Sequence, residues 1–479
     1  MAFSRHYSPI TSEHRIPPEQ RIYVNRNLRM NSVGAVGFDL DHTLAHYRGP
    51  EIEELAYRLS GRRLIERFGF PEALAKIPYE RNFVIRGLVV DKKRGNILKM
   101  DYHNYVSRAY HGRRSLSDEE RKNSYRTGRV RMGGKTYVSV DTLFHLPEVF
   151  LYANLIGMRE EGLIPAKRTP REIYANVREA IDSVHGDGSL KTEILGNLSK
   201  YIRRNPLLTQ TLEEIRSSGK KIFLLTNSEF YYTRALLSHL MDKDGEETWG
   251  RHFDYIVVDA RKPGYFVDLS LPAKKSKEKL PKGFAPVVHG GNARSLENNV
   301  GFAGDQILYF GDHTYGDILR SKKNLGWRTA MVVEELEEEI AVNRQIESLV
   351  DELNDWTSRR GFIETDIAGL ERQRLEAKRT GQKASTFNGM DARIQELRKD
   401  LAEIKVSMGE LGDRIHNAYN PYWGSVFREG RETSRFSHQV KDFACIYMSR
   451  VTNLLNYHPN FYFRSAEERL PHENIPLLR

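Results

Sequence analysis

Cysteine is nearly missing from this chain of 479 residues, which contains only Cys445. A single cysteine cannot form an intrachain disulfide, so the sequence predicts a protein of the reducing cytoplasm. No apolar run approaches the roughly 20 residues that a membrane helix needs. The opening stretch "MAFSRHYSPITSEHRIPPEQ" has no apolar segment typical of a secretory signal. These absences argue against secreted and membrane-spanning classes, and we expect a soluble cytoplasmic protein.

The composition is basic and sufficient for large cores. Lys and Arg number 74 against 64 Asp and Glu, which gives a net charge of +10, and 39% of residues are hydrophobic. A positive balance suits an anionic ligand such as a nucleotide, a nucleic acid or an acidic membrane, without choosing among them. The length exceeds what one core usually spans, so two or three structural units are expected.

Short apolar runs predict five strands, and the last four of them alternate with helix-like stretches. Alternation of this kind predicts an α/β protein with a doubly wound parallel sheet. The five runs cover residues 33–40, 220–227, 253–259, 306–312 and 328–333.

Polar residues stand where four of these strands end: Asp39, Thr226, Asp259 and Asp312. In parallel sheets, ligands bind beyond the carboxyl ends of the strands. Such a shared placement therefore predicts a site at that edge. Taken alone, the string "DLDHT" could equally be a turn followed by a helix cap.

The expected domain organisation follows from the spacing of the strands. About 180 residues separate the first two strands, too many for a loop in a compact domain. After residue 334 a heptad spacing of apolar residues predicts a helical hairpin with a turn at "TGQKASTFNG", for which a simple packing arm is the alternative. Residues 271–299, rich in Lys, Gly and Asn, are expected to form a mobile excursion. The predicted parts are an N-terminal segment with the first core strand (1–47), an inserted cap domain (48–205), the catalytic core (206–334), the hairpin (335–417) and a C-terminal segment packed on the core (418–479).

The polar residues at the strand ends suit phosphoryl transfer. Asp39 is the candidate nucleophile, because a carboxylate can attack phosphorus and form an aspartyl-phosphate. Asp41 can protonate the leaving oxygen and later deprotonate water. Thr226 and the amide after it can hold phosphoryl oxygens, and Lys262 can neutralise charge on the transferring group.

A divalent cation would relieve the repulsion among the carboxylates. Asp312 and Asp317 add acidic groups opposite Asp39 and Asp41, and Mg²⁺ prefers oxygen ligands of this kind. We therefore expect Mg²⁺ on Asp39, Asp41 and Asp312, with Asp317 behind them. Each residue alone has a simpler explanation, such as a helix cap for Asp317.

The motifs together resemble those of a known family. The stretches that carry the resemblance are "FDLDHTLAHY", "TLFHLPE", "VREAIDSVHGDGSLK", "LLTNSEFYYT", "VVDARKPGYF", "YFGDHTYGDILRSKKNLGWRT" and "FYFRSAEERLPHE". They are similar to those of the cytosolic purine 5′-nucleotidases, within the haloacid dehalogenase superfamily, and extend from residue 38 to about 473. This resemblance implies a Rossmannoid core with an α+β cap.

The resemblance also implies roles for residues outside the strand ends. It places Phe144 on the purine with His145 beside it, and Arg178 and Asp182 at the six-oxo edge of the base. An ordinary ion pair between Arg178 and Asp182 is the alternative. The remaining implied contacts to ribose and phosphate are His185, Lys191, Asn227 and Ser228.

The function implied is Mg²⁺-dependent hydrolysis of purine nucleoside 5′-monophosphates, IMP and GMP preferred, with phosphotransfer to a second nucleoside. The resemblance further implies a homotetramer and activation by purine nucleotides at Arg131, Lys323 and Arg328, for which a plain basic surface is the alternative. No aromatic-basic motif of RNA-binding proteins is visible, so no nucleic-acid partner is expected. A phosphatase for another phosphometabolite and a non-catalytic nucleotide-binding regulator stay open as alternatives.

Overall fold

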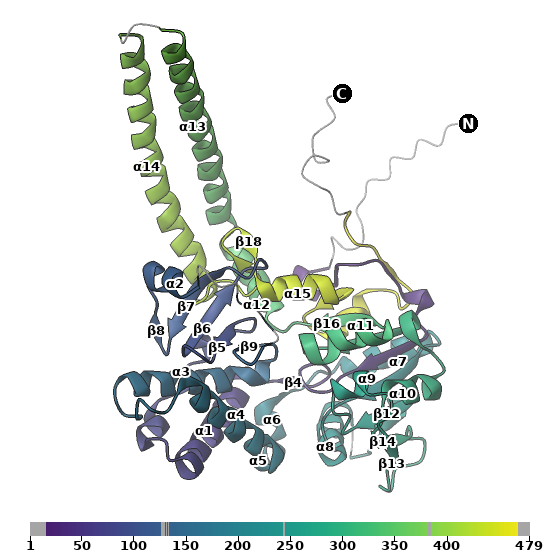
Figure 1. Ribbon diagram of the computed structural model, residues 1–479. Coiled ribbons are helices and arrows are strands. Elements are labelled where there is room, and N and C mark those ends of the chain that lie inside the picture. The colour runs from purple at the N-terminus through teal and green to yellow at the C-terminus, as the bar shows by residue number, and fades with distance from the viewer. Residues whose placement is uncertain are drawn as a thin grey trace, which may run out of the picture. The chain divides into compact units, whose positions relative to one another are not determined.

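The structure is a computed structural model that describes residues 16–125, 130, 132, 134–242, 245–381 and 385–467 (Figure 1). The chain divides into two compact units, Met1–Glu337 with Val426–Arg479 and Glu338–Ser425. Among the described helices, none is long and apolar enough to cross a bilayer.

A nine-stranded sheet organises the first unit, with the order β1-β19-β16-β15-β3-β11-β12-β14-β13. Its inner strands, from β19 to β14, are parallel to their neighbours, while β1 and β13 pair antiparallel at the two ends. The strands are β1 (Tyr23–Val24), β3 (Ala35–Phe38), β11 (Lys221–Leu225), β12 (Tyr255–Val258), β13 (Ala273–Lys275), β14 (Val287–Gly290), β15 (Ile307–Gly311), β16 (Arg328–Val332) and β19 (Ile446–Met448).

The α/β class with a large parallel sheet is therefore confirmed, and each of the five predicted strands is present as β3, β11, β12, β15 or β16. The expectation of a mobile excursion over 271–299 was wrong. That stretch holds β13, β14 and helix α10 (Ala293–Val300). Its apolar residues are few but grouped, and Val287 and Val288 are buried where β14 joins the sheet.

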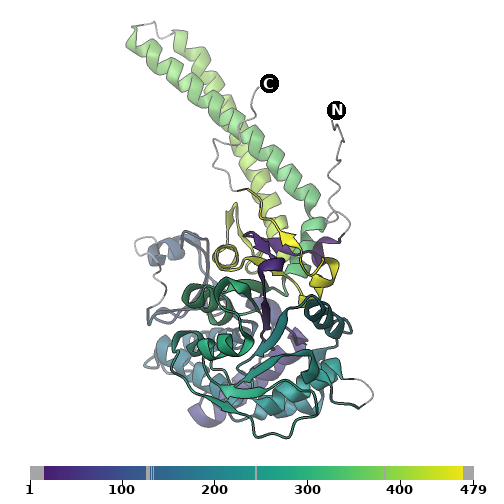
Figure 2. The same ribbon diagram turned by 90° about the vertical axis from the view of Figure 1, so that its right-hand side faces the viewer.

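Helices cover both faces of the sheet, as Figure 2 shows from the side. Because neighbouring side chains on a strand point to opposite faces, Val36 and Phe38 pack in one cluster and Ala35 in another. The first cluster includes residues of α7 (Leu208–Ser217) and α8 (Phe230–Met241), and the second includes residues of α9 (Gly264–Val267) and α10. The sheet is thus doubly wound.

A second, antiparallel sheet lies in the chain between β3 and β11, with the order β8-β7-β6-β5-β9. Its strands are β5 (Val89–Asp91), β6 (Asn96–Met100), β7 (Val106–His111), β8 (Arg114–Ser115) and β9 (Tyr137–Ser139). The helices of this region are α1 (Gly49–Phe68), α2 (Asp118–Tyr125), α3 (Leu146–Glu160), α4 (Pro170–Gly186), α5 (Ser189–Gly196) and α6 (Leu198–Tyr201). Helix α4 begins at a capping box, in which Thr169 and Glu172 satisfy each other's backbone donors.

Two long helices, α13 (Glu347–Arg379) and α14 (Ser385–Tyr419), pack along each other in the second unit. The heptad spacing accounts for this packing, since Ile394, Leu397, Ile404 and Leu411 of α14 are buried although most of their neighbours are exposed. The remaining strands and α-helices are β2 (Leu28–Arg29), β4 (His46–Tyr47), β10 (Ile202–Arg203), α11 (Arg320–Leu325), α12 (Leu336–Gln345), β17 (Arg428–Glu429), β18 (Glu432–Thr433), α15 (Arg435–Phe443) and β20 (Tyr462–Phe463). The short 3₁₀ helices are η2 (Pro18–Gln20), η3 (Met30–Ser32), η4 (Glu72–Lys76), η5 (Arg81–Phe83), η6 (Leu143–His145), η7 (Trp249–His252), η8 (Gly304–Gln306) and η10 (Val451–Asn456).

Candidate active site

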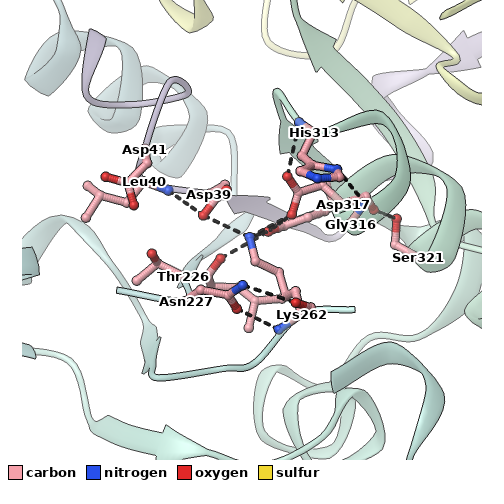
Figure 3. A network of polar contacts seen from close by, with 12 residues as sticks. Asp39, Leu40, Asp41, Thr226, Asn227, Lys262, His313, Gly316, Asp317 and Ser321 are labelled. Atoms are coloured by element: carbon pink, nitrogen blue, oxygen red, sulfur yellow. Dashed lines mark hydrogen bonds and ion pairs between the residues drawn. The ribbon is translucent and has the colours of Figure 1, made fainter. Parts of the chain in front are cut away.

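The carboxyl edge of the parallel strands gathers the predicted polar residues. One polar residue directly follows each of four strands: Asp39 follows β3, Thr226 follows β11, Asp259 follows β12 and Asp312 follows β15. These strands are neighbours in the order β15-β3-β11-β12, so their ends meet at one edge. The structure therefore has these residues where they were predicted, and Figure 3 shows Asp39 and Thr226 with their neighbours from close by.

Lys262 is at the centre of the polar network. Its Nζ lies 2.8 Å from Asp39 Oδ1 and 2.6 Å from Asp317 Oδ1, and it donates to the Tyr309 hydroxyl at 2.9 Å. The side chain is only 4% exposed. The two carboxylates outweigh the effect of burial and raise the pKa of Lys262, so this group stays a cation.

Asn227 fixes the turn that carries Lys262. The side-chain amide of Asn227 donates to the Lys262 carbonyl at 3.1 Å, and its oxygen accepts the Lys262 N–H at 2.6 Å. The same turn places Asp259 and Arg261 in the left-handed backbone region, with φ of 52° and 61°. The substrate contact predicted for Asn227 stays a prediction, and in this structure its side chain holds the Lys262 backbone.

Asp317 reaches the network from a π-helical segment, η9 (Thr314–Leu319). Its Oδ2 accepts the His313 N–H at 3.3 Å, and its Cβ lies only 2.5 Å from where a Cβ on Gly311 would stand. Glycine is therefore required at the end of β15 for Asp317 to approach the sheet. One carboxylate oxygen from each of Asp39, Asp312 and Asp317 lies within 4.8 Å of the others.

These carboxylates are buried at an energetic cost. Burial raises the pKa of Asp312 to about 7, and it raises the pKa of Asp39 well above the ordinary range although Lys262 opposes the shift. Asp312 Oδ2 is buried and has no hydrogen-bond partner in the described part of the chain. Oxygen ligands, repulsion and an unpartnered buried oxygen together fit a hard divalent cation.

Asp41 lies beside this cluster and has different partners. Its Oδ1 accepts the Tyr47 hydroxyl at 2.6 Å, and its Oδ2 accepts the Ser228 hydroxyl at 2.7 Å. Thr226 is fully buried, and its hydroxyl accepts the Ser228 N–H at 3.0 Å. The predicted residues Asp41, Thr226 and Ser228 are thus brought together on one side of Asp39.

Aromatic rings connect the antiparallel region to the loop after Asp41. The Phe144 ring lies edge-on to the His42 ring, with centroids 4.7 Å apart, and 5.8 Å from the His185 ring. Burial and, to a smaller extent, the neighbouring Lys191 lower the pKa of His185 to about 4, so this imidazole is neutral at physiological pH. Lys191 forms an ion pair with Glu229 and lies over the Tyr232 ring at 5.4 Å.

Arg178 is bound on two sides. Its Nε and Nη2 donate to the Asp182 carboxylate at 3.0 and 2.7 Å, and its Nη1 donates to Glu148 Oε2 at 2.8 Å. The same Nη1 lies 3.2 Å from His145 Nε2, and burial lowers the pKa of that imidazole. The structure thus has the Arg178–Asp182 ion pair that was the alternative to base recognition, with His145 beside it.

The predicted effector residues lie elsewhere. Lys323 on α11 lies 5.5 Å over the Phe443 ring, and Arg328 donates to the Asn27 carbonyl at 2.7 Å. Because β16 begins at Arg328, this side chain is at the opposite edge of the sheet from Asp312. Arg131 lies outside the described residues.

Sequence reasoning missed several side chains of this region, among them Tyr47, whose hydroxyl donates to Asp41, and also Tyr309 and Glu148. Tyr309 is the hydroxyl partner of Lys262, but its position within an apolar strand gave no signal. Glu148 is 1% exposed and accepts from both Arg178 and the Tyr174 hydroxyl. A lone charge in the apolar run "FHLPEVFLYANLIGM" could have revealed it, because an unpaired carboxylate is rarely buried.

Comparison with known proteins gives consistent matches over most of the chain. Residues 22–475 match the model of the 5′ nucleotidase family. A 5′-nucleotidase domain-containing protein from Dictyostelium discoideum is 28% identical over 470 residues, which cover 95% of this chain and 75% of that one. 5′-Nucleotidase domain-containing protein 2 is 29% identical in Homo sapiens, covering 96% of this chain and 87% of that one. The Rattus norvegicus form is 30% identical, with 96% and 82% covered.

Among solved structures, a predicted phosphoglycolate phosphatase from Haemophilus somnus is 14% identical, covering 63% of this chain and 86% of that one. Its TM-score of 0.29 is too low to bear on fold or function. The family match instead spans nearly all of the sequence and includes every strand end that carries the polar network. The chain therefore belongs to the 5′ nucleotidase family, and it is a hydrolase of nucleoside monophosphates.

Proposed function

We propose that this 5′-nucleotidase hydrolyses purine nucleoside 5′-monophosphates, IMP and GMP above others, through an aspartyl-phosphate on Asp39 with Mg²⁺ as cofactor. The observation that carries the proposal is the position of Lys262 between Asp39 and Asp317, at the strand edge where Asp312 also lies. A carboxylate and a phosphate repel each other because both are negatively charged. A fixed cation beside the carboxylate balances this charge and so favours attack on the phosphate. The arrangement resembles that of the haloacid dehalogenase superfamily.

In the first step, Asp39 Oδ attacks phosphorus, and the bond from phosphorus to the nucleoside 5′-oxygen breaks. Asp41 gives its proton to that leaving oxygen. The hydroxyls of Tyr47 and Ser228, which already donate to Asp41, stabilise the carboxylate that results. In the second step, Asp41 takes a proton from water, whose oxygen attacks phosphorus and releases Asp39 and phosphate. A second nucleoside in place of water would give phosphotransfer.

The three carboxylates that lie together, Asp39, Asp312 and Asp317, would hold Mg²⁺. Asp41, which was also predicted to bind the metal, has both carboxylate oxygens bonded to the Tyr47 and Ser228 hydroxyls. When bound, the cation supplies charge neutralisation at the carboxylates and at the phosphoryl oxygens. The unpartnered Asp312 Oδ2 and the raised pKa values of Asp39 and Asp312 support this assignment. Thr226 and the backbone that follows it would receive the remaining phosphoryl oxygens.

The region 48–205 would act as the cap that selects the base. Phe144 would stack on the purine, while Arg178 and Asp182, with His145 nearby, would recognise its six-oxo edge, and His185 and Lys191 would lie near the ribose and phosphate. A site built to bond a polar edge rejects ligands that lack it, because its own buried groups are then left without partners. The contact of Phe144 with His42 supports a base close to the Asp41 loop.

We further propose the predicted regulation and assembly. Purine nucleotides would activate the enzyme through Arg131, Lys323 and Arg328, and the enzyme would be a cytoplasmic homotetramer. Lys323 lies on α11, which directly continues η9, the segment that carries Asp317. A nucleotide that shifts α11 would therefore displace a carboxylate of the catalytic cluster without a long pathway.

The test is a phosphate-release assay with IMP, GMP, AMP, CMP and a panel of non-nucleotide phosphomonoesters, with and without Mg²⁺. We expect the highest kcat/KM for IMP and GMP, only with the metal present. Equal efficiency for all four nucleotides would refute the base assignment. Preference for a non-nucleotide ester would favour the alternative phosphatase, and no turnover of any ester would favour a nucleotide-binding regulator.

A further inference from the structure

Two adjacent glutamates, Glu334 and Glu335, lie between β16 and α12 and contact different catalytic loops. Glu334 reaches the loop that follows β3 and contains Asp39 and Asp41. Glu335 reaches, through Arg86, the loop that follows β15 and begins with Asp312. The proposed mechanism uses none of the three charged side chains, Arg86, Glu334 and Glu335. The Arg86 side chain is fully buried, and the two glutamates are about four-fifths buried.

Arg86 comes from the segment just before β5 and has a side chain with 0% exposure. Its Nε donates to Glu335 Oε1 at 2.9 Å, its Nη2 donates to Glu335 Oε2, and its Nη1 donates to the Asp312 carbonyl at 3.0 Å. The guanidinium also lies 4.8 Å over the Phe436 ring. Because Arg presents its donors in a rigid planar fork, these contacts fix the Asp312 backbone relative to Glu335.

Glu334 holds the other loop through histidine. Its Oε1 lies 2.8 Å from His42 Nδ1 and 3.5 Å from His46 Nδ1. His42 directly follows Asp41 and has a left-handed backbone with φ of 53°. A residue other than glycine is uncommon in the left-handed backbone region and stays there only when its surroundings fix it. Glu334 supplies part of that restraint, and the Tyr47 and Phe144 rings supply more.

We propose that Arg86, Glu334 and Glu335 are positioning residues that set the distance between the Asp39–Asp41 loop and the Asp312 loop, and so set the affinity for divalent metal. The inference rests on the proposed function, since it concerns the same metal site. The loops follow adjacent strands, β3 and β15, and the Asp39 N–H still donates to the Phe310 carbonyl at 2.9 Å just past the end of β3. Further along the two loops the carboxylates repel each other, so side chains must hold them together. Because Glu334 and Glu335 are consecutive, their backbone spacing is fixed, and together they can hold the two loops at a set distance.

The predicted magnitude comes from residues that orient metal ligands in other proteins. Loss of such a partner lowers metal affinity by about 10- to 100-fold. Arg86→Lys removes the planar fork and keeps the charge, and Glu335→Gln keeps the shape and removes the charge. Glu334→Gln perturbs the other loop independently, so that one variant that fails to fold does not decide the result.

A matched control lies two residues after Glu335, in the first turn of α12. Glu337 forms a two-point ion pair with Arg450, at 2.6 and 2.8 Å, and neither residue contacts the acidic loops through a described hydrogen bond. Glu337→Gln therefore removes an ion pair of similar geometry from a neighbouring position. We expect its midpoint for Mg²⁺ to stay within about twofold of the wild-type midpoint.

The experiment titrates Mg²⁺ into metal-free full-length protein without substrate and follows the rise in melting temperature. We expect the midpoint to shift upward about 10- to 100-fold in Arg86→Lys, Glu335→Gln and Glu334→Gln. At saturating Mg²⁺, kcat for IMP should recover in these variants, because the side chains that react are intact.

Variants that melt at lower temperature with an unchanged Mg²⁺ midpoint would overturn the inference, because the three residues would then serve only folding. In that case wild-type Mg²⁺ binding would leave the proposed function standing. A wild-type protein that shows no response to Mg²⁺ would instead overturn both the metal assignment and the inference.

Discussion

Glu148→Gln tests whether the buried contacts of Arg178 serve base recognition. Glu148 accepts from the Arg178 guanidinium at 2.8 Å and from the Tyr174 hydroxyl, and it is 1% exposed. Glutamine preserves the shape but removes the charge that Arg178 faces, while the bonds to Asp182 remain. A hydrogen bond to a charged group contributes about 1.5–3 kcal/mol. If Arg178 must keep its position to bind the base, kcat/KM for IMP should fall by about 10- to 100-fold.

The assay compares IMP with p-nitrophenyl phosphate, an ester that has no purine for Arg178 to recognise. We expect the loss with IMP only, and Glu160→Gln on the same helix, where Glu160 is half exposed, should behave as the wild type. An equal loss for both esters would refute the reasoning, since Glu148 would then support the fold of the region and not recognition. Thermal melting of both variants separates a general loss of stability from either result.

Four further outcomes are expected. Asp39→Asn should lower phosphate release from IMP by at least about 10²- to 10³-fold while the melting temperature is maintained, and wild-type turnover would exclude Asp39 as nucleophile. Removal of divalent metal with EDTA should abolish turnover, and Mg²⁺ should restore it; activity that persists would contradict the metal assignment. Burial raises the pKa of Glu53 from 4.5 to about 7, so the folded state loses stability as pH rises between these values. Glu53→Gln should therefore gain about 3 kcal/mol relative to the wild type between pH 4 and pH 8, measured by urea unfolding, and a pH-independent difference would disprove the shift. Lys323→Ala should weaken activation by ATP or GTP without abolishing basal turnover, and a titration that shows no activation of the wild type would exclude the effector site.

The sequence predicted the parts of the site that depend on local pattern. Asp39, Thr226 and Asp312 could be placed because each directly follows a short apolar run, and parallel strands bring such positions to one edge. Lys262 could be placed in the same way, because it lies in the turn that follows β12. These residues could be assigned together because backbone geometry, and not side-chain packing, determines where they lie.

Other contacts could not be predicted because they depend on tertiary packing. Arg86 and Glu335 are 249 residues apart, and nothing in either local pattern indicates the partner. The two hydrogen bonds between the Asn227 amide and the Lys262 backbone depend on a turn whose shape no local rule gives. Strand β14 escaped detection as a part of the sheet because only Val287 and Val288 of its four residues are apolar.

The π-helical segment η9 imposes a constraint on chain length. Its hydrogen bonds span five residues instead of four, as in the bond from the Ile318 N–H to the His313 carbonyl, and Asp317 lies within it. Deletion of one residue between Asp312 and Asp317 would rotate the following side chains by about 100°, which would turn the carboxylate away from Lys262. The number of residues between Asp312 and Asp317 is therefore fixed by the ion pair of Asp317 with Lys262. An alignment gap in the interval, in any relative, would thus identify a chain in which that lysine has a different partner.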